Sequence, residues 1–350
     1  MSHRVAVLAG DGVGPEVVAE ARRAVDALGL GIDWTELPWG SARYHEHGRM
    51  MPEDWKEQLS GFRAVLLGAI GDPSVPDHVS LWGSILELRQ RLDLWANLRP
   101  CRLLPGIPGP LAGREPDDVD ILFVRENTEG EYAGVGGRAH RGLPGEVGVE
   151  VSVFTRAGCE RVLRLAFECA AQRRGLHLLT SATKSNASRY GYVLWDEVAS
   201  ELAAEFPTVR YERVLVDALA ARMVRSPDSL DVVVASNLFA DILTDLGAAI
   251  QGGMGMAASA NIAPDRPGSI GVFEPVHGSA PDIAGQGIAN PSGAIWSAVL
   301  MLEHLGEPDA AARLLEALES TCREGPRTRD AGGTASTREV GDAVVASLTA

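Results

Sequence analysis

Two aspartates, Asp241 and Asp245, follow a β-branched apolar run in the segment from Asp231 to Gly247. They stand four residues apart, so on a helix their carboxylates point the same way. Like charges one turn apart destabilise a helix unless a cation offsets them, and Mg²⁺ and Mn²⁺ prefer carboxylate oxygens. The alternative is a pair of solvated surface acids. The position after a buried-type strand, where α/β enzymes tend to place their sites, favours the metal interpretation.

Arginines are the next candidates, because the guanidinium group suits bidentate recognition of carboxylates. Arg89 and Arg99 flank the segment QRLDLWANL, and Arg125 ends an apolar strand predicted over Ile121–Val124. An arginine at the carboxyl end of such a strand is well placed to meet a ligand. Most arginines of the chain are expected at the surface, and for Arg125 both interpretations remain open.

A lysine and a tyrosine could supply proton transfer. Lys184 follows a strand predicted to begin at Leu178, and a lysine there can act as a base if its neighbours lower its pKa. Tyr132 lies in the loop GEYAG and could act as a general acid. The alternatives are a surface lysine and a packing tyrosine.

Two turn-rich segments remain. The segment Gly10–Glu16, GDGVGPE, lacks the G-x-G-x-x-G spacing because Pro15 stands where the third glycine is needed, so we interpret it as a tight turn at a helix start. The segment Glu274–Gly285, EPVHGSAPDIAG, is polar, and Asp282 could hold a ribose diol. The alternative for that segment is an exposed Ω-type loop.

Size and charge limit the function classes. The chain has 350 residues, a hydrophobic fraction of 45% and a net charge of -15, which argues against a nucleic-acid or anionic-membrane partner. No apolar run is long enough to span a bilayer, and the first residues lack a secretory apolar region. Four cysteines lack metal-ligand spacing and a disulfide pattern, so a cytoplasmic location is expected: Cys101, Cys159, Cys169 and Cys322.

Strand and helix signals alternate, which predicts an α/β fold without internal repeats. No linker stands out, so a chain with two lobes would cross between them more than once. The predicted strands are 5–8, 64–67, 121–124, a half-buried strand at 148–154, one from 178, and 231–235. The predicted helices are 15–27, 81–92, 156–174, 190–206, the carboxylate helix after 235, 291–305 and 308–324, with the last third otherwise loop-like.

Taken together, the segments resemble the β-decarboxylating dehydrogenase family, which includes isocitrate, 3-isopropylmalate, homoisocitrate and tartrate/D-malate dehydrogenases. The resemblance covers essentially the whole chain through GDGVGPE, NLRP, RENTEGEY, ATKSN, ASNLFADILTDLG, EPVHGSAPDIAG and IANP. The segment VSLWGSILELR, with RENTEGEY, is most similar to the tartrate/D-malate branch. Isocitrate enzymes are expected to carry a serine where this chain has Gly83, and isopropylmalate enzymes usually lack LWGS.

The resemblance implies a role for each matching residue. Tyr132 would be the general acid, and Lys184, acting from the other subunit, would be the base on the 2-hydroxyl. The metal, Mg²⁺ or Mn²⁺, would be bound by Asp241 and Asp245 together with Asp217 of the partner chain. Substrate-binding residues would be Arg89, Arg99 and Arg125. Candidates for the wall that meets the third substituent are Trp82, Ser84, Ile85 and Leu86, with Trp82 and Ile85 foremost. Residues lining NAD would be Asn186, Glu274, His277, Gly278, Ser279, Ala280, Asp282, Ile283 and Asn290.

The implied fold is the two-lobe isopropylmalate dehydrogenase-like α/β fold, which is non-Rossmann and has a discontinuous large domain. Residues 1–99 and 252–350 would form the cofactor lobe, and 100–251 the dimerisation and metal-binding lobe. The implied protein is a homodimer with shared active sites that oxidises and decarboxylates a malate-type dicarboxylate with NAD. A monovalent cation such as K⁺ is a further candidate.

Three alternatives remain open at this point. Ile85 and Leu86 could instead form an apolar pocket suited to 3-isopropylmalate or another 3-substituted malate. A non-catalytic regulatory subunit is a candidate from another class, although Tyr132, Lys184 and the metal aspartates are all present. A plain magnesium hydrolase would leave the loop from His277 to Asp282 unexplained.

Overall fold

The computed structural model describes residues 3–349, and the chain divides into two compact units. Unit 1 combines Met1–Leu94, Arg99–Val119 and Ala248–Ala350, and unit 2 combines Trp95–Leu98 and Asp120–Gly247. Strand β4, Ala96–Arg102, therefore begins in unit 2 and ends in unit 1. The sequence predicted the first boundary after residue 99, whereas residues 100–119 lie with unit 1.

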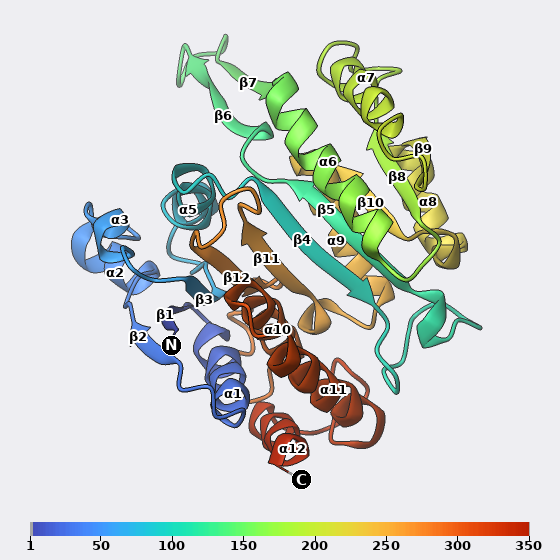
Figure 1. Ribbon diagram of the computed structural model, residues 1–350. Helices are drawn as coiled ribbons and strands as arrows, with labels where there is room; N and C mark the ends of the chain where they lie inside the picture. The colour runs from blue at the N-terminus through green and yellow to red at the C-terminus, as the bar shows by residue number, and fades with distance from the viewer. Residues whose placement is uncertain (1–2, 350) are drawn as a thin grey trace. The chain divides into compact units, whose positions relative to one another are not determined.

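Unit 1 is a mainly parallel sheet with helices packed on it (Figure 1). Its strands run in the order β2-β1-β3-β12-β11; β1 pairs parallel with β2 and β3, β3 pairs parallel with β12, and β11 pairs antiparallel with β12. β3 is buried along its whole length, as expected for a central parallel strand with both faces covered. The strands are β1 (Arg4–Gly10), β2 (Asp33–Glu36), β3 (Ala64–Ala69), β11 (Ala258–Ile262) and β12 (Gly271–Pro275).

The helices of unit 1 fall into a packed group and a set of short helices. α10 contacts β12, α1 and α11, and it is buried on most of its surface because it lies between the sheet and α11. The packed group is α1 (Gly14–Asp26), α10 (Ser292–Leu305), α11 (Pro308–Glu324) and α12 (Thr337–Thr349). The short helices are α2 (Ser41–His47), α3 (Trp55–Gln58), α4 (Asp77–Trp82), α5 (Ile85–Arg91) and the 3₁₀ turns Pro116–Asp118 and Met254–Met256.

Unit 2 contains a second group of parallel strands in the order β5-β10-β8-β9. α6 crosses in front of β5 and β10 in Figure 1 and α9 lies behind them, so these strands are covered on both faces. The strands are β5 (Asp120–Glu126), β8 (Leu178–Thr183), β9 (Arg210–Leu215) and β10 (Val232–Ala235). The helices are α6 (Arg156–Gln172), α7 (Gly191–Ala203), α8 (Val216–Arg225), α9 (Asn237–Ile250) and the 3₁₀ turn Pro227–Ser229.

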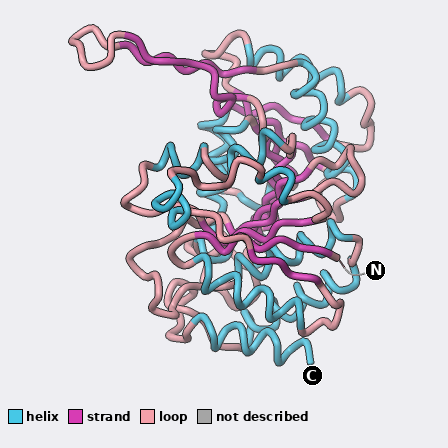
Figure 2. The backbone as a smooth tube through the Cα atoms, turned by 90° about the vertical axis from the view of Figure 1, so that its left-hand side faces the viewer, coloured by secondary structure: helices cyan, strands magenta, loops and turns pink. Residues whose placement is uncertain are grey.

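Unit 2 also carries a two-stranded hairpin, which we call the arm. It is formed by β6 (Gly130–Ala139) and β7 (Val147–Val153), and Figure 2 shows it projecting from the rest of the unit. Valines at its surface are about half exposed: Val135, Val147, Val149 and Val151. The prediction that 148–154 is half-buried was wrong, because β6 and β7 pair only with each other and β7 is exposed along nearly its whole length.

Two further predictions need correction. The single helix predicted over 81–92 is broken at Gly83–Ser84 into α4 and α5. A Cβ atom on Gly83 would lie 2.8 Å from the Val79 carbonyl oxygen and 2.9 Å from Met50 Cγ, so this close approach needs a glycine. The last third is also less loop-like than expected, since it contains β11 and β12.

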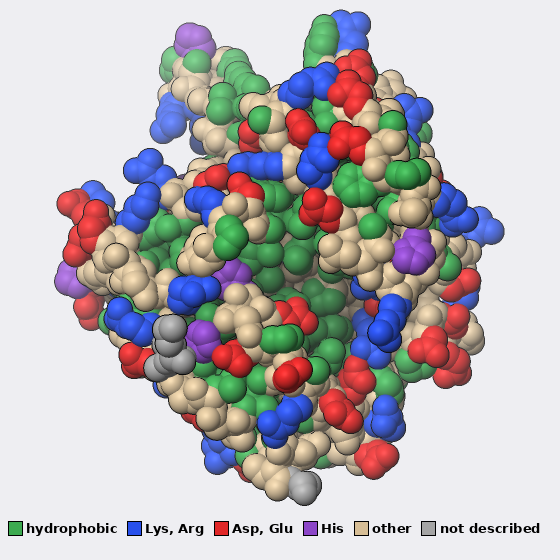
Figure 3. Space-filling view, in the orientation of Figure 1, with side chains coloured by type: hydrophobic (Ala, Val, Ile, Leu, Met, Phe, Trp, Pro, Cys, Tyr) green, Lys and Arg blue, Asp and Glu red, His purple; other side chains and the backbone are tan. Residues whose placement is uncertain are grey.

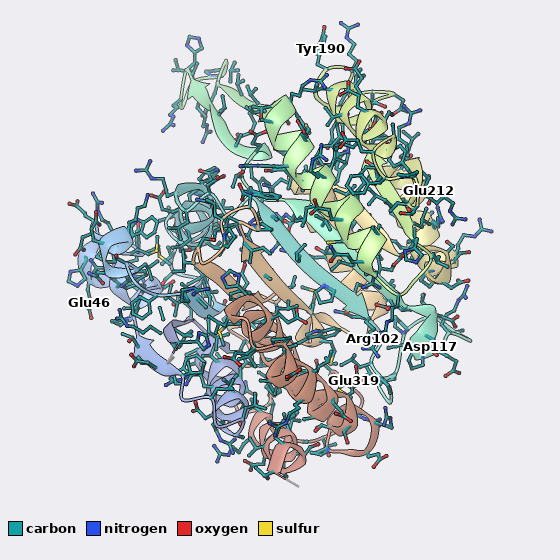
Figure 4. All side chains as sticks on the ribbon, in the orientation of Figure 1. Glu46, Arg102, Asp117, Tyr190, Glu212 and Glu319 are labelled. Carbon is teal, nitrogen blue, oxygen red and sulfur yellow. The ribbon has the colours of Figure 1, made fainter. Side chains whose placement is uncertain are left out.

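Among the residues that the structure describes, the face shown in Figure 3 has no large patch of a single charge sign. Acidic and basic side chains are interspersed over the face shown in Figure 3, despite the net charge of -15. Within unit 1, Arg102 and Glu319 form an ion pair with an N–O distance of 2.6 Å (both labelled in Figure 4). All four cysteines are free thiols, in agreement with the sequence interpretation. Over residues 3–349, no helix has the length and apolar character needed to cross a membrane.

Candidate active site

Two of the candidates of unit 2, Tyr132 and Asp241, meet near the start of α9. β10 pairs with β5 so that Ala235 lies opposite Arg125, which brings Arg125 beside the first turns of α9. There the guanidinium of Arg125 forms an ion pair with Asp241 Oδ1, and the Tyr132 hydroxyl donates to Asp241 Oδ2 at 3.1 Å. Arg125 is only 1% exposed, and its guanidinium also donates to Asn237 Oδ1.

The ion pair with Arg125 also bears on the repulsion between the two α9 carboxylates. The repulsion between Asp241 and Asp245 is partly offset by the Arg125 guanidinium, so the spacing alone does not require a metal. Asp241 is half-buried and Asp245 exposed on the same helix. Carboxylate oxygens one helical turn apart are nevertheless a donor set that suits a hard divalent cation.

A second carboxylate holds the tyrosine loop against α9. Glu131 Oε1 accepts from the Tyr192 hydroxyl at 2.6 Å, and Glu131 Oε2 accepts from the Leu238 backbone N–H at 3.0 Å. Asn237 Nδ2 donates to the Glu129 carbonyl oxygen at 3.1 Å. These contacts tie the residues on either side of Gly130 to the first turn of α9, and so fix Tyr132 beside Asp241.

The electrostatics keep Tyr132 protonated. Burial raises the pKa of the Tyr132 phenol, the charge and hydrogen bond of Asp241 raise it further, and Arg125 opposes them. A tyrosine with a raised pKa carries its proton throughout the neutral range. It can therefore donate that proton, which is the role expected of a general acid.

The candidate base forms a separate group. Lys184, in the turn after β8, donates to Asp217 Oδ1 at 2.7 Å, and Asp217 lies in the first turn of α8. The hydrogen bond from Lys184 lowers the pKa of Asp217, which is 65% exposed. Within residues 3–349 of one chain, no three His, Cys, Asp or Glu side chains lie together in a metal-binding cluster. Within one chain, therefore, Lys184 is hydrogen-bonded to Asp217 and Tyr132 to Asp241, as two separate pairs.

Unit 1 brings a predicted substrate arginine together with the start of the predicted cofactor segment. Arg89, in the last turn of α5, donates to Glu274 Oε1 at 2.9 Å, and Asn261 Nδ2 donates to the same oxygen at 3.1 Å. Arg89 is 6% exposed, and its Nε–H is buried without a hydrogen-bond partner. A buried N–H without an acceptor destabilises the folded chain, and an anionic ligand that binds beside Arg89 would supply that acceptor. Arg99, in β4, is equally buried.

A cavity of about 530 Å³ lies beside the segment that follows β12. His277 Nδ1 lies 2.9 Å from the Gly278 carbonyl oxygen, so Nδ1 carries the proton and Nε2 is an acceptor. Nε2 is buried without a partner, and burial lowers the pKa of His277, which favours the neutral ring. The cavity is lined by Val13, Met254, Gly255, His277, Ala280, Ile283, Ile288, Ala289, Asn290, Arg329 and Asp330.

The lining of this cavity suits an adenine ring. Apolar side chains such as Ile283 and Ile288 can pack on a flat ring, and the unpartnered His277 Nε2 can accept from its amino group. Of the predicted cofactor residues, His277, Ala280, Ile283 and Asn290 line the cavity, whereas the exposed Asp282 and the buried Ser279 are not among its lining residues. Asn186, predicted near the nicotinamide, is exposed in unit 2.

The predicted substrate wall divides into two environments. Trp82 is 38% exposed and lines a different cavity of about 450 Å³ with Met50, Met51 and Trp55. Ile85 is 6% exposed and buried in the first turn of α5.

Sequence reasoning missed several residues of these groups. In unit 2 they are Glu131, Tyr192 and Asn237; in unit 1 they are Val13, Met254, Arg329 and Asp330. Glu131 stood inside a motif already singled out, beside Tyr132, and that adjacency could have identified it. No local spacing pattern connects Arg329 and Asp330 to the segment after β12.

Comparisons with known proteins identify the family. Residues 4–344 match the family described as Isocitrate/isopropylmalate dehydrogenase. The chain is 51% identical to a "Probable tartrate dehydrogenase/decarboxylase" of Agrobacterium vitis, over 98% of this chain and 95% of the relative. It is 49% identical to the "D-malate dehydrogenase [decarboxylating]" of Escherichia coli, over 97% of each. The crystal structure of an isocitrate dehydrogenase from Methylococcus capsulatus matches with a TM-score of 0.90 and 35% identity, over 99% of this chain and 100% of that one.

Proposed function

The chain belongs to the isocitrate/isopropylmalate dehydrogenase family, and we propose that it oxidises and decarboxylates a malate-type 2-hydroxy dicarboxylate, with D-malate as the first candidate and tartrate as the second. The observation that carries the proposal is the contact of Tyr132 and Arg125 with Asp241. It gathers an acid, a carboxylate-binding cation and a metal-type ligand at the start of one helix. The names of the two relatives support the substrate class.

The chain's own residues have separate tasks in this reaction. Arg89, Arg99 and Arg125 bind the substrate carboxylates, because buried guanidinium groups pair strongly with them. Lys184 accepts the proton of the 2-hydroxyl when its amine is uncharged, and the Tyr132 hydroxyl protonates the carbon that loses CO₂. When bound, NAD supplies the hydride acceptor and a divalent cation on Asp241 and Asp245 supplies Lewis-acid polarisation.

NAD rather than NADP is the proposed cofactor, because an exposed carboxylate at Asp282 would repel a 2′-phosphate. Mg²⁺ or Mn²⁺ is the proposed metal, on the carboxylate donors of α9.

We also propose that two chains share each site, with Lys184 and Asp217 of one acting beside Asp241 and Asp245 of the other. Lys184 and Asp217 are already paired within one chain, so they would enter together. Exposed apolar side chains suit a chain-to-chain interface: Val224 on α8, Ile242 on α9 and the valines of the arm. Sedimentation equilibrium should give a dimer; a monomer that is fully active would contradict this.

The test of the reaction is a steady-state panel with NAD and Mn²⁺ on the purified chain. The substrates are D-malate, the tartrate isomers, 3-isopropylmalate and isocitrate, and D-malate or a tartrate should give the highest kcat/KM. Asp241→Asn should abolish NADH formation, whereas the control Asp309→Asn, at an exposed position of α11, should not. A preference for isocitrate or 3-isopropylmalate would refute the substrate assignment, and no turnover on any substrate would favour a regulatory subunit.

A further inference from the structure

The turn at the start of α1 is attached to the segment that borders the cofactor cavity. The Val13 N–H donates to the Ser279 carbonyl oxygen at 2.8 Å. Gly12 has φ +56, and a Cβ atom there would lie 1.9 Å from that same carbonyl oxygen. Only glycine allows this approach, so the motif GDGVGPE supports the loop after β12 and does not itself form a dinucleotide fingerprint.

The second attachment is made by Glu16, in the first turn of α1. Its Oε1 accepts from the Gly285 N–H, and its Oε2 accepts from the Gly287 N–H at 3.1 Å. Both glycines are left-handed, with φ of +75 and +65, so the chain bends twice around the carboxylate. Each carboxylate oxygen of Glu16 therefore holds one backbone donor of the loop.

The segment between these attachments carries the residues that meet the cofactor. Ile283 lines the cavity, and Asp282 is the residue proposed to select NAD. Internal bonds run from the Ile283 N–H to the Ala280 carbonyl oxygen at 3.1 Å and from Gln286 Nε2 to the Asp282 carbonyl oxygen at 2.8 Å. The loop is thus a compact turn, whose orientation depends on what holds its two ends.

The far end of the loop is held independently of α1. Thr337, at the start of α12, donates its N–H to the Gly287 carbonyl oxygen at 2.8 Å and its hydroxyl to the Ala289 carbonyl oxygen at 2.6 Å. Loss of the Glu16 contacts would therefore free the backbone around Gly285, while Ser279 stays attached to Val13 and the Gly287 carbonyl oxygen stays attached to Thr337. Such a change should alter the cavity wall without unfolding the unit.

We infer that Glu16 is a positioning residue that fixes the loop from Ser279 to Gly287 in the shape that binds the dinucleotide. Glu16 acts through the two glycine N–H groups and not through contact with the cofactor. A loop ordered in advance does not lose that freedom on binding, so its affinity is higher than that of a mobile loop. The inference rests on the proposed function, because it assumes that the cavity binds NAD.

The decisive variant is Glu16→Gln. Glutamine has one carbonyl oxygen to accept with, and its amide group would face the second glycine N–H as a donor, so one of the two attachments is lost. Titration of NADH fluorescence should show a dissociation constant about tenfold higher, which is about 1.4 kcal/mol. KM for NAD should rise in parallel, while KM for D-malate and kcat at saturating NAD change by less than about twofold.

Two further variants complete the experiment. Glu16→Asp keeps both oxygens on a side chain one methylene shorter, so its NADH affinity should be intermediate. Glu57→Gln is the matched control, since Glu57 is exposed on α3. It should bind NADH like the parent chain. If Glu16→Gln does not fold, the comparison rests on Glu16→Asp, and parental affinity in that variant would overturn the inference.

The outcomes separate the inference from the function on which it rests. A parent chain that does not bind NADH would remove the proposed function and the inference together. A parent that binds NADH and a folded Glu16→Gln chain that binds it equally well would overturn the inference alone. An equal rise in KM for NAD and for D-malate in Glu16→Gln would also overturn the inference, because it would show that Glu16 has a general structural role.

Discussion

Replacement of Tyr132 by phenylalanine tests the proposed role of Tyr132 as the general acid. The change removes the hydroxyl that donates to Asp241 Oδ2 at 3.1 Å and keeps the ring near the Arg125 guanidinium, 5.7 Å from the ring centre. Asp241 keeps its ion pair with Arg125, so the carboxylate that loses the tyrosine hydroxyl still has a cation beside it. The variant should therefore fold and bind substrate while lacking the proton donor.

The expected effects differ in size between catalysis and stability. A positioned acid contributes about 10²–10⁴-fold to the rate, so kcat should fall by that factor, which is about 2.7–5.5 kcal/mol in activation free energy. The lost hydrogen bond to a charged acceptor is worth about 1.5–3 kcal/mol when buried, and Tyr132 is half-buried, so the unfolding free energy should fall by the lower figure or less. KM for D-malate should stay within about threefold.

The assay is NADH formation with saturating D-malate, NAD and Mn²⁺, together with thermal unfolding of the same samples. Tyr44→Phe, a tyrosine of α2 in unit 1, is the control and should keep parental turnover. A folded Tyr132→Phe chain with kcat within about threefold of the parent would refute the assignment of Tyr132 as the acid.

Three other predictions concern the cofactor, the shared site and alkaline pH. The parent should prefer NAD strongly, and Asp282→Lys should lower the ratio of NAD to NADP activity; equal use of both by the parent would contradict the role of Asp282. Asp241→Asn and Lys184→Ala chains should each be inactive, and mixed dimers should regain activity by restoring one intact site; no recovery in verified heterodimers would argue for sites within one chain. Burial raises the pKa of the Cys159 and Cys322 thiols to about 12 and that of Cys169 to about 11, against about 8.5 in an unfolded chain. Above about pH 8.5 the thiols of the unfolded chain lose protons that the folded chain still holds. The unfolding free energy is therefore highest below that pH and falls as the pH rises through 11 to 12. The thermal midpoint should fall between pH 9 and 11, and less steeply in Cys322→Ala; a constant midpoint would count against this linkage.

The predictable parts of the fold were those fixed by local pattern. Pro15 at the helix start and the buried run Ala64–Leu67 led to correct positions for α1 and β3, because backbone geometry and burial periodicity act over neighbouring residues. The buried run before Asn237 likewise located β10 and the start of α9. The break at Gly83 was not predicted, and the crowding there comes partly from outside the local pattern, since a Cβ atom would meet Met50 from another segment as well as the Val79 carbonyl oxygen.

In the site, too, local motifs identified some residues, whereas roles that depend on distant segments were not predicted. The motifs singled out Tyr132 and Asp241, and their contact is observed. The anchoring role of Glu131 depends on Tyr192 and Leu238, which lie far along the chain, so no spacing rule could show it. In the same way, the function of Glu16 depends on two backbone donors near the other end of the sequence.

The most direct test of the proposed reaction measures NADH and CO₂ together, from D-malate and NAD, on the purified chain with and without a divalent metal. The account predicts equal amounts of both products with Mn²⁺, and their loss on chelation with recovery when Mn²⁺ is returned. NADH formation without CO₂, or turnover that survives complete removal of the metal, would contradict it.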